Sequence, residues 1–197
     1  KANQEYITKW ISEPDKGIYD AMNKGLKMAT GDYVWFINAG DEIYAPDTIE
    51  KMVAAQPGAD VYYGDTLIVG EKGKSIGLRR LRPPEKLTWQ SFQMGQLVSH
   101  QAFIAKRELA PLYDLNYKHS ADTDWQIKIL KHSNQIANTN QILCKFLDWG
   151  KSKHTIVPSL KERFHIMVKN YGLVITMLNH FMISIKFLRF LFRFRRF

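Results

Sequence analysis

The sequence predicts an α/β protein with a mixed β-sheet flanked by helices. Apolar runs typical of strands alternate with segments of helical periodicity along residues 12–147, and this alternation is typical of layered α/β domains. The clearest strand is the run YVWFI at residues 33–37, which stops at the polar sequence NAGD at residues 38–41. In α/β proteins, polar groups at the end of a buried strand commonly line a ligand crevice. The fold class therefore also indicates where a site would lie.

The first half of the chain is expected to contain a helix on each side of that strand. Residues 16–29 have a mostly apolar stripe at helical spacing, and Gly31 lies near the expected stop. A second helix is expected from residue 45 to residue 55, because Pro46 suits a first turn and Asp47 favours the helix dipole. Further strands are expected at 60–63 and 66–69, followed by a turn at 70–73 and a proline-containing loop at 79–84.

The second half is expected to hold two more strands, one helix and a helical tail. The expected elements are a strand at 98–105, a helix at 122–131 and a strand at 142–147. The composition then shifts, and residues 151–154 have the character of a linker that leads to helices over 159–197. We therefore expect a catalytic-type body at 1–150 and a basic helical tail at 151–197.

Composition narrows the possible partners and compartments. At 197 residues the chain fits one domain with an appendage. Its single cysteine, Cys144, excludes an internal disulfide, suits a reducing cytoplasm and is expected to be a buried small hydrophobe. The formal charge of +9 comes entirely from residues 151–197, which hold 10 Lys and Arg residues and one Glu. The neutral body argues against a nucleic acid as partner, since binding one needs a basic face on the folded domain.

The end of the tail has the pattern of a basic amphipathic helix. Four basic residues share one face: Lys186, Arg189, Arg193 and Arg196. Five apolar residues fill another face: Ile183, Phe187, Phe190, Leu191 and Phe194. We expect this helix to bind an anionic membrane surface, and the apolar stretch 171–185 to be interfacial or re-entrant, because crossing a bilayer takes about 20 apolar residues. The alternatives are a helix docked on the protein's own body and a helix that forms a dimer.

Three blocks of sequence carry a resemblance to a known family. They are SEPDKGIYDAMNKGL with GDYVWFINAGDE between residues 12 and 42, SHQAFIAK at 99–106 and ADTDW at 121–125. The chain resembles family 2 glycosyltransferases with the GT-A fold, in the branch that makes bacterial surface polysaccharides. The resemblance implies a GT-A mixed sheet with an incomplete Rossmann-like nucleotide half, because the family's first βαβ unit is not found before Ser12. It also implies an N-terminally truncated chain, and we expect this fragment alone to be inactive.

Transfer of a sugar from a nucleotide donor requires neutralisation of the departing diphosphate, usually by a divalent cation held by acids. The family usually has an Asp-x-Asp metal motif at the position of residues 38–41. In this sequence Asn38 and Gly40 stand where the family has acidic residues, so Asp41 is the carboxylate of the motif that remains. The resemblance implies that Asp41 and Asn38, with phosphate oxygens and waters, hold Mg²⁺ or Mn²⁺. The alternative is that NAGD is a turn and Asp41 a structural cap.

The reaction also needs a carboxylate that deprotonates the acceptor hydroxyl. The resemblance assigns this role to Asp122, with Ala121 in place of the Glu of the family's Glu-Asp pair. Asp124 is expected to orient Asp122 or bind acceptor, Trp125 is a candidate to stack on a sugar ring, and His100 is expected to face the acceptor or donor sugar. Each of these residues also has a structural interpretation: the two acids as helix caps, Trp125 as a core residue and His100 as a structural histidine.

The expected nucleotide crevice is bordered by Asp15, Asn23 and Lys24, although a lysine on a helix is usually solvated. The arginines of the loop at 79–84 are either a lid over a phosphate or part of a solvated loop. The Gln-x-x-Arg-Trp motif of processive synthases is absent from the sequence, which favours transfer of a single sugar.

These observations together favour an inverting hexosyltransferase. It would move one sugar from a nucleotide-sugar donor to a hydroxyl of a polysaccharide or lipid-linked acceptor. The tail would hold it in the cytoplasm, peripheral to the inner membrane face. The rival hypothesis is a non-catalytic, membrane-associated scaffold domain that keeps the fold, and the altered metal motif supports that rival.

Overall fold

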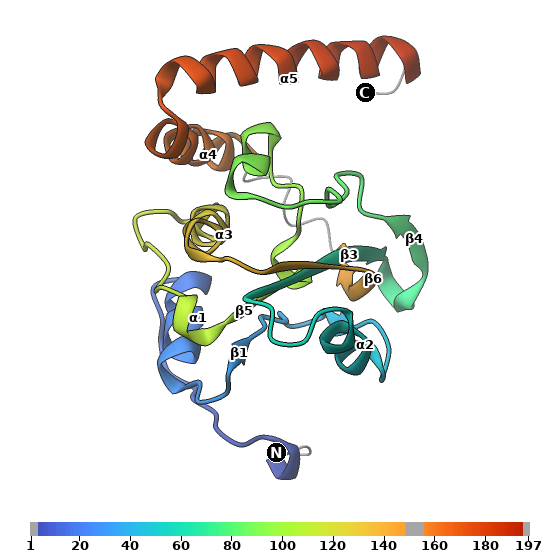
Figure 1. Ribbon diagram of the computed structural model, residues 1–197, viewed down its shortest axis with the longest axis vertical. Coiled ribbons are helices and arrows are strands. Elements are labelled where there is room, and N and C mark those ends of the chain that lie inside the picture. Colours follow the sequence, from blue (N-terminus) through green and yellow to red (C-terminus); the bar gives the residue numbers. More distant parts are fainter. Residues whose placement is uncertain (1–3, 149–155, 195–197) are drawn as a thin grey trace.

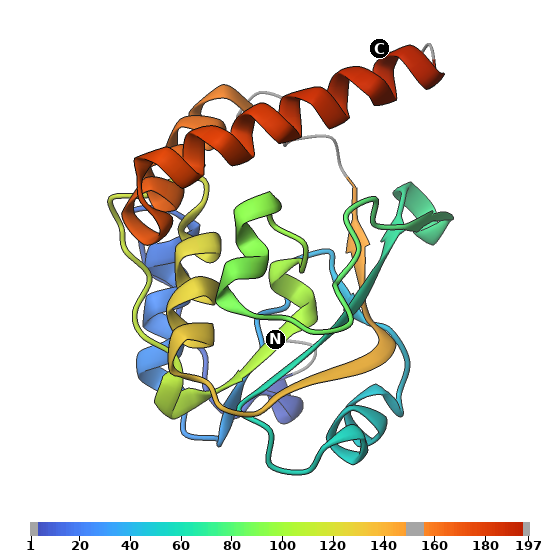
Figure 2. The same cartoon turned by 45° about the horizontal axis from the view of Figure 1, so that its top comes forward.

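The computed structural model describes residues 4–148 and 156–194. A central sheet is flanked by helices, and the two C-terminal helices lie together at one end of the molecule (Figure 1). The first and third helices lie side by side at one edge of the sheet, whereas the second lies near the opposite edge (Figure 2). The helices are, in chain order, α1 (Ile18–Met28), α2 (Thr48–Ala55), α3 (Ala121–His132), α4 (Ile156–Tyr171) and α5 (Leu173–Phe194).

The six-stranded sheet is mixed, as the sequence predicts. The strands are β1 (Tyr33–Val34), β2 (Glu42–Ile43), β3 (Val61–Val69), β4 (Ser75–Leu78), β5 (Phe103–Lys106) and β6 (Ile136–Leu147). Their order is β1-β5-β3-β6-β2, with β4 paired to β3. The central strands β3 and β6 run parallel, whereas the other pairs are antiparallel. The parallel pair puts the C-terminal ends of β3 and β6 at the same end of the sheet, the end at which β4 lies (Figure 1).

Asp60 fixes the starting register of that parallel pair. Its Oδ1 accepts a hydrogen bond from Lys106 Nζ at 2.7 Å, and its Oδ2 accepts from the backbone N–H groups of residues 134–135 at 2.8 and 3.0 Å. The bond from Lys106 is the main cause that lowers the pKa of Asp60 below its ordinary value. These bonds bring the first residues of β3 and β6, Val61 and Ile136, opposite each other.

The strand predicted at residues 33–37 was wrong in length, because ladder pairing ends at Val34. Continued at the same register, Trp35 and Phe36 would stand opposite Ile104 and Phe103 of β5, but they form no ladder pairs with them. Beyond Phe103 the neighbouring chain forms the 3₁₀ turn His100–Ala102. Trp35 instead uses its side chain, and its Nε1 donates to the carbonyl of Gln101 at 2.8 Å. The same turn explains why the strand predicted at 98–105 covers only its second half.

Two other predicted strands were also wrong in extent. The segments 60–63 and 66–69 form one strand, β3, which stays continuous past Gly64. A Cβ at Gly64 would lie 2.5 Å from the carbonyl oxygen of Gln141, so the close approach of β3 and β6 requires glycine. Strand β6 begins earlier than the predicted residue 142, and β4 was not predicted at all.

One hydrophobic core joins the sheet to α1, α3 and α4. Its largest fully buried side chains include Tyr62, Tyr63, Phe103, Ile104, Trp125, Ile127 and Ile166. Cys144 is buried there, and burial raises the pKa of its thiol to about 11, which confirms the predicted inert position. Helix α4 contributes Ile166, Met167 and Tyr171 to the same core. The domain boundary expected at residue 150 stays a prediction.

Helix α4 is also held to the segment before α3 by the side chain of Glu162. The carboxylate of Glu162 accepts hydrogen bonds from three consecutive backbone N–H groups, those of residues 118–120, at 2.8 to 2.9 Å. These residues lead directly into the first turn of α3. At its other end, α4 is separated from α5 by Gly172, whose φ of +83° favours glycine. Helix α4 therefore positions the start of α3.

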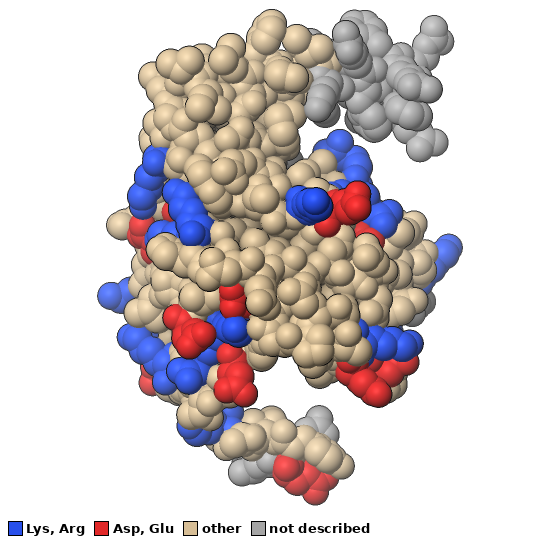
Figure 3. All heavy atoms as spheres, viewed as in Figure 1, with Lys and Arg blue, Asp and Glu red and all other residues tan. Residues whose placement is uncertain are grey.

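Helix α5 has a different character over its described side chains. Seven large apolar side chains are more than 45 % exposed: Leu173, Val174, Ile175, Met177, Leu178, Phe181 and Met182. On the face seen in Figure 3, this end of the molecule carries no charged side chains over the first half of α5. The basic face predicted from Lys186, Arg189, Arg193 and Arg196 lies outside the described side chains. Within the described residues, no helix is long and apolar enough to span a bilayer.

Candidate active site

A cavity of about 330 Å³ lies where α1, the segment 96–101, the first turn of α3 and α4 meet. It takes side chains from eight parts of the chain, from Ile18 to Arg163. Its polar lining consists of Tyr19, Asn38, Thr66, Arg79, Gln96, Ser99, His100, Gln101, Asp122 and Arg163. Three of the predicted site residues, Asn38, His100 and Asp122, therefore meet in one cavity.

Asp122 stands in the first turn of α3, where the helix dipole favours a negative charge. Its Oδ1 accepts a hydrogen bond from Tyr19 Oη at 3.1 Å, and its Oδ2 accepts from Gln96 Nε2 at 2.7 Å. Burial, followed by the charge of Asp122, raises the pKa of Tyr19, so the phenol stays protonated and donates. Both partners of the carboxylate are thus neutral donors, which orient it without neutralising it.

His100 is a buried member of the lining. Its Nε2 lies 2.6 Å from Tyr113 Oη, and its ring stacks on Phe36 with centroids 5.3 Å apart. Burial lowers the pKa of His100, against the nearby charges of Asp122 and Asp41. His100 is therefore a neutral ring that lines the cavity and is also packed in the core. The two interpretations that the sequence left open, a residue facing the sugar and a structural histidine, do not exclude each other.

The NAGD sequence forms a turn, in which the N–H of Asp41 donates to the carbonyl of Asn38 at 2.9 Å. Asp41 Oδ2 accepts from Gln101 Nε2 at 2.8 Å, and its Oδ1 accepts from the backbone N–H of Leu147 at 3.0 Å. Gly40 has a φ of +94°, and a Cβ there would lie 2.9 Å from a Leu147 methyl carbon. An acid at residue 40 would therefore not fit this turn.

The donor set at this turn suits a divalent cation only together with a ligand's phosphate. In the described part of the chain, no group of three or more His, Cys, Asp or Glu side chains is arranged to hold a metal. Asp41 offers carboxylate oxygens that each keep a lone pair beyond their one hydrogen bond, and Asn38 offers an amide oxygen at the cavity. Mg²⁺ is commonly bound by one or two carboxylates plus substrate phosphates.

Asp124 and Trp125 do not line the cavity. Asp124 is 1 % exposed, and its Oδ2 lies 2.6 Å from Lys128 Nζ in an ion pair that lacks hydrogen-bond geometry. Trp125 is 1 % exposed, stacks on Tyr113 with centroids 5.0 Å apart and donates from Nε1 to the carbonyl of Pro111 at 2.8 Å. Asp124 is thus paired inside the protein, whereas Trp125 packs behind the cavity wall, with its ring centroid 5.7 Å from that of His100.

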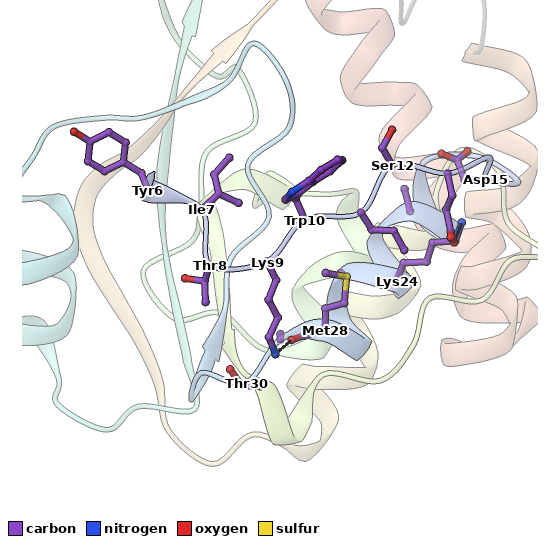
Figure 4. A pocket seen from close by; sticks show the side chains of 15 residues that line it. Tyr6, Ile7, Thr8, Lys9, Trp10, Ser12, Asp15, Lys24, Met28 and Thr30 are labelled. Carbon is purple, nitrogen blue, oxygen red and sulfur yellow. Dashed lines mark hydrogen bonds and ion pairs between the residues drawn. The ribbon is translucent and has the colours of Figure 1, made fainter. Parts of the chain in front are cut away.

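The three predicted nucleotide residues do not all come together. Asp15 and Lys24 line a second, larger hollow of about 850 Å³ between residues 6–13 and the other face of α1 (Figure 4). Asn23 instead clasps the backbone of Tyr113, donating from Nδ2 to its carbonyl at 3.0 Å and accepting its N–H at 2.7 Å. The hollow lined by Asp15 and Lys24, which we call the α1 groove, is thus separated from the Asp122 cavity by helix α1.

The charged groups in the α1 groove already have partners within the protein. Lys24 Nζ lies 2.8 Å from a carboxylate oxygen of Glu13 and also donates to the carbonyl of Pro14 at 2.8 Å. Asp15 Oδ1 accepts from the N–H of Gly17 at 2.8 Å and so shapes the turn that starts α1. The aromatic side chains that border the groove are exposed to solvent, and Trp10 is 67 % exposed (Figure 4).

Sequence reasoning missed Tyr19, Gln96 and Arg163. Tyr19 lies inside the recognisable block at 12–26, but its role depends on Asp122, 103 positions further along the chain. Gln96 lies just before the SHQAFIAK block, and Arg163 lies in the tail, where sequence pattern indicated only a helix. A tyrosine within hydrogen-bond reach of a carboxylate leaves no local signal.

The fold and the cavity together define a mixed α/β protein with a hydrogen-bonded carboxylate at a polar cavity, and the comparisons give its family. The sequence profile described as "Glycosyl transferase family 2" matches residues 2–110. The chain therefore belongs to glycosyl transferase family 2.

Its relatives agree with this assignment. An uncharacterized glycosyltransferase of Mycobacterium tuberculosis H37Rv is 32% identical over 149 residues, covering 74% of this chain and 56% of that protein. A PGL/p-HBAD biosynthesis glycosyltransferase of Mycobacterium bovis BCG is 27% identical over 155 residues, with the same two coverages. The chain thus spans about half the length of the curated relatives it matches.

A solved structure confirms the fold. The crystal structure of S. aureus TarS 1-349 is similar with a TM-score of 0.55 and 18% identity, over 80% of this chain and 47% of that one. This likeness confirms the predicted α/β fold of GT-A type, with a mixed sheet and flanking helices.

Proposed function

We propose that the protein transfers one sugar from a nucleotide-sugar donor to a hydroxyl of an acceptor, with Asp122 as the general base. The observation that carries the proposal is the state of Asp122. It lies in a cavity, at a helix N-terminus, and its partners Tyr19 and Gln96 are neutral donors rather than cations. A carboxylate with these two partners keeps lone pairs for a third hydrogen bond, from an acceptor hydroxyl.

The reaction then proceeds in one displacement. Asp122 takes the proton of the acceptor hydroxyl as its oxygen bonds to the anomeric carbon. The bond from that carbon to the diphosphate oxygen breaks, and its electron pair leaves with the nucleoside diphosphate. Because attack and departure occur on opposite faces of the sugar, the anomeric configuration inverts. His100, neutral and fixed by Tyr113 and Phe36, forms the wall against which the sugar packs.

A divalent cation is a further part of the proposal. Asp41 and Asn38 would hold Mg²⁺ or Mn²⁺ jointly with the donor's phosphates, and the ion would offset the charge of the leaving diphosphate. Because the described residues supply a single carboxylate there, we expect the cation to bind only together with a nucleoside diphosphate.

The acceptor is proposed to be a polysaccharide or a lipid-linked intermediate. Two observations support it: one relative is named for PGL/p-HBAD biosynthesis, and α5 presents an apolar surface that includes Val174 and Phe181, 72 % and 67 % exposed. With the basic residues that follow in sequence, α5 would rest on the cytoplasmic face of the membrane. The enzyme would then meet acceptors at that surface.

Product stereochemistry tests the proposal. Because the fragment alone is expected to be inactive, the full-length protein that contains this chain is incubated with a panel of nucleotide sugars and a simple hydroxyl acceptor, and the anomeric proton of the product is observed by NMR. We expect one sugar added per acceptor, with a β linkage from an α-linked donor, and product formation by the Asp122→Asn protein that is slower by roughly 10²–10⁴-fold. Retention of configuration would rule out the one-step displacement. A correctly folded protein that yields no product with any donor would favour the scaffold hypothesis instead.

A further inference from the structure

Two arginines line the Asp122 cavity without an acidic partner of their own. Arg79 comes from the loop after β4, and Arg163 comes from α4. Within the described residues, every ion pair joins other side chains, and neither guanidinium lies within ion-pair distance of a carboxylate. An arginine cannot shed its proton to relieve such a position. The cavity therefore holds two fixed positive charges beside the single carboxylate of Asp122.

Arg79 is oriented by the protein backbone. Its Nη1 donates to the carbonyls of Leu81 and Leu97 at 3.0 and 3.2 Å, which fixes the plane of the guanidinium at the cavity wall. Burial, followed by the charge of Arg163, lowers the pKa of Arg79. The two cations thus lie close enough to repel each other, an arrangement that an anion between them would relieve.

Arg163 has donors to spare. Its Nη2 reaches Gln96 Oε1 at a long 3.4 Å, and its buried Nε has no hydrogen-bond partner in the described part of the chain. Buried donors in proteins are nearly always satisfied, so the described residues do not fully pair this guanidinium. A guanidinium presents its N–H groups in a planar fork that matches the oxygens of a phosphate or carboxylate.

We propose that Arg79 and Arg163 bind a phosphoryl group of a substrate inside the Asp122 cavity. The cavity is then two-sided, with arginines for the phosphate and Asp122 for a hydroxyl. This inference rests on the proposed function for the identity of the substrate, and it names its chemistry: a phosphate close to the reacting centre. The phosphate has two possible sources, the diphosphate of the donor and a phosphate carried by the acceptor.

Calorimetric titration tests the inference without requiring transfer. The chain is titrated with inorganic phosphate, with UDP and GDP for the donor source, and with glycerol 3-phosphate and geranyl phosphate for the acceptor source. We expect Arg163→Gln and Arg79→Gln each to weaken binding of inorganic phosphate and of one source by about tenfold, which corresponds to about 1.4 kcal/mol. Arg163→Lys, which keeps the charge but loses the fork, should weaken it less.

Arg107→Gln is the matched control, because Arg107 is exposed and does not line the cavity. Circular dichroism and thermal melting verify that each variant is folded. Binding of all probes by both variants at wild-type strength would overturn the inference, as would failure of the wild-type chain to bind any probe. Arginine-dependent phosphate binding in a protein that transfers no sugar would sustain this inference while the proposed function fails.

Discussion

The two faces of α1 border two hollows of opposite character. The face that carries Ile18, Tyr19 and Met22 closes the Asp122 cavity, where polar side chains from distant segments hydrogen-bond one another. The face that carries Lys24 and Met28 borders the α1 groove, whose other wall is the largely exposed segment 6–13. One helix thus serves a small preorganised cavity and a large open groove.

The difference is one of preorganisation. In the cavity, the hydrogen bonds of Asp122 are set before any ligand arrives, which is the condition under which electrostatic groups stabilise a transition state. In the groove, Lys24 pairs with the half-exposed Glu13, and exposed pairs of this kind contribute little to stability. Chemistry is therefore expected in the cavity, and binding of more adaptable ligand parts is expected in the groove.

The largest structural effect is expected from the contact that ties α4 to the cavity. Glu162→Ala removes an ionised acceptor from the three N–H groups of residues 118–120, just before Asp122. Hydrogen bonds to charged groups are worth about 1.5–3 kcal/mol, and these are partly solvated, so we expect the free energy of unfolding to fall by about 2 kcal/mol. Urea unfolding measures it.

Glu50→Ala, at an exposed position of α2, serves as the control for that loss. We also expect the transfer rate of Glu162→Ala to fall, because the start of α3 loses its support. An unchanged unfolding midpoint would show that α4 does not hold the cavity together.

A smaller effect is expected from the phenol beside the base. Tyr19→Phe keeps the ring but removes the donor to Asp122 Oδ1, so the carboxylate loses part of its orientation. We expect kcat to fall roughly tenfold, or about 1.4 kcal/mol in activation free energy. Tyr44→Phe, at a 39 % exposed tyrosine, should leave kcat unchanged. Equal rates for Tyr19→Phe and wild type would mean that the contact is only structural.

The smallest effect concerns pH. Because burial lowers the pKa of His100, the unfolded chain binds a proton more readily than the folded one below about pH 6.5, the ordinary value for histidine. The free energy of unfolding should therefore fall as the pH drops from 7.5 to 5.5, and His100→Gln should flatten that slope. His132→Gln, at an exposed histidine, is the control. A slope that is the same in all three proteins would remove His100 as the cause.

Sequence reasoning succeeded where the signal is local. The periodicity of residues 16–29 and the ADTDW block placed α1, α3 and Asp122 correctly, since helix starts and apolar stripes are properties of short segments. It failed where function depends on long-range contacts. Asn23 is a polar residue of a type that often binds ligands, but its amide forms two hydrogen bonds with the backbone of Tyr113, 90 positions away. Arg163 reaches the cavity only because α4 packs back onto the core.

Strand errors have a similar origin. The run at 33–37 is apolar enough for a strand, but a ladder also depends on the partner strand, and pairing with β5 ends at Val34 although Ile104 and Phe103 of β5 follow in register. The break expected between 63 and 66 reflects Gly64 and Asp65, residues that disfavour strands in isolation. Their place in β3 follows from the close approach of β6, which accepts only a residue without a side chain at that point.

The contrast between the two hollows is tested most directly by steady-state kinetics of two matched carboxylate variants. Asp122→Asn removes a base from the cavity, and Asp15→Asn makes the same chemical change in the α1 groove. We expect Asp122→Asn to lower kcat by roughly 10²–10⁴ with little change in donor KM. Asp15→Asn should leave kcat within about threefold and act, if anywhere, on donor KM. A wild-type kcat for Asp122→Asn, or an equal loss of kcat for Asp15→Asn, would contradict the placement of the chemistry in the Asp122 cavity.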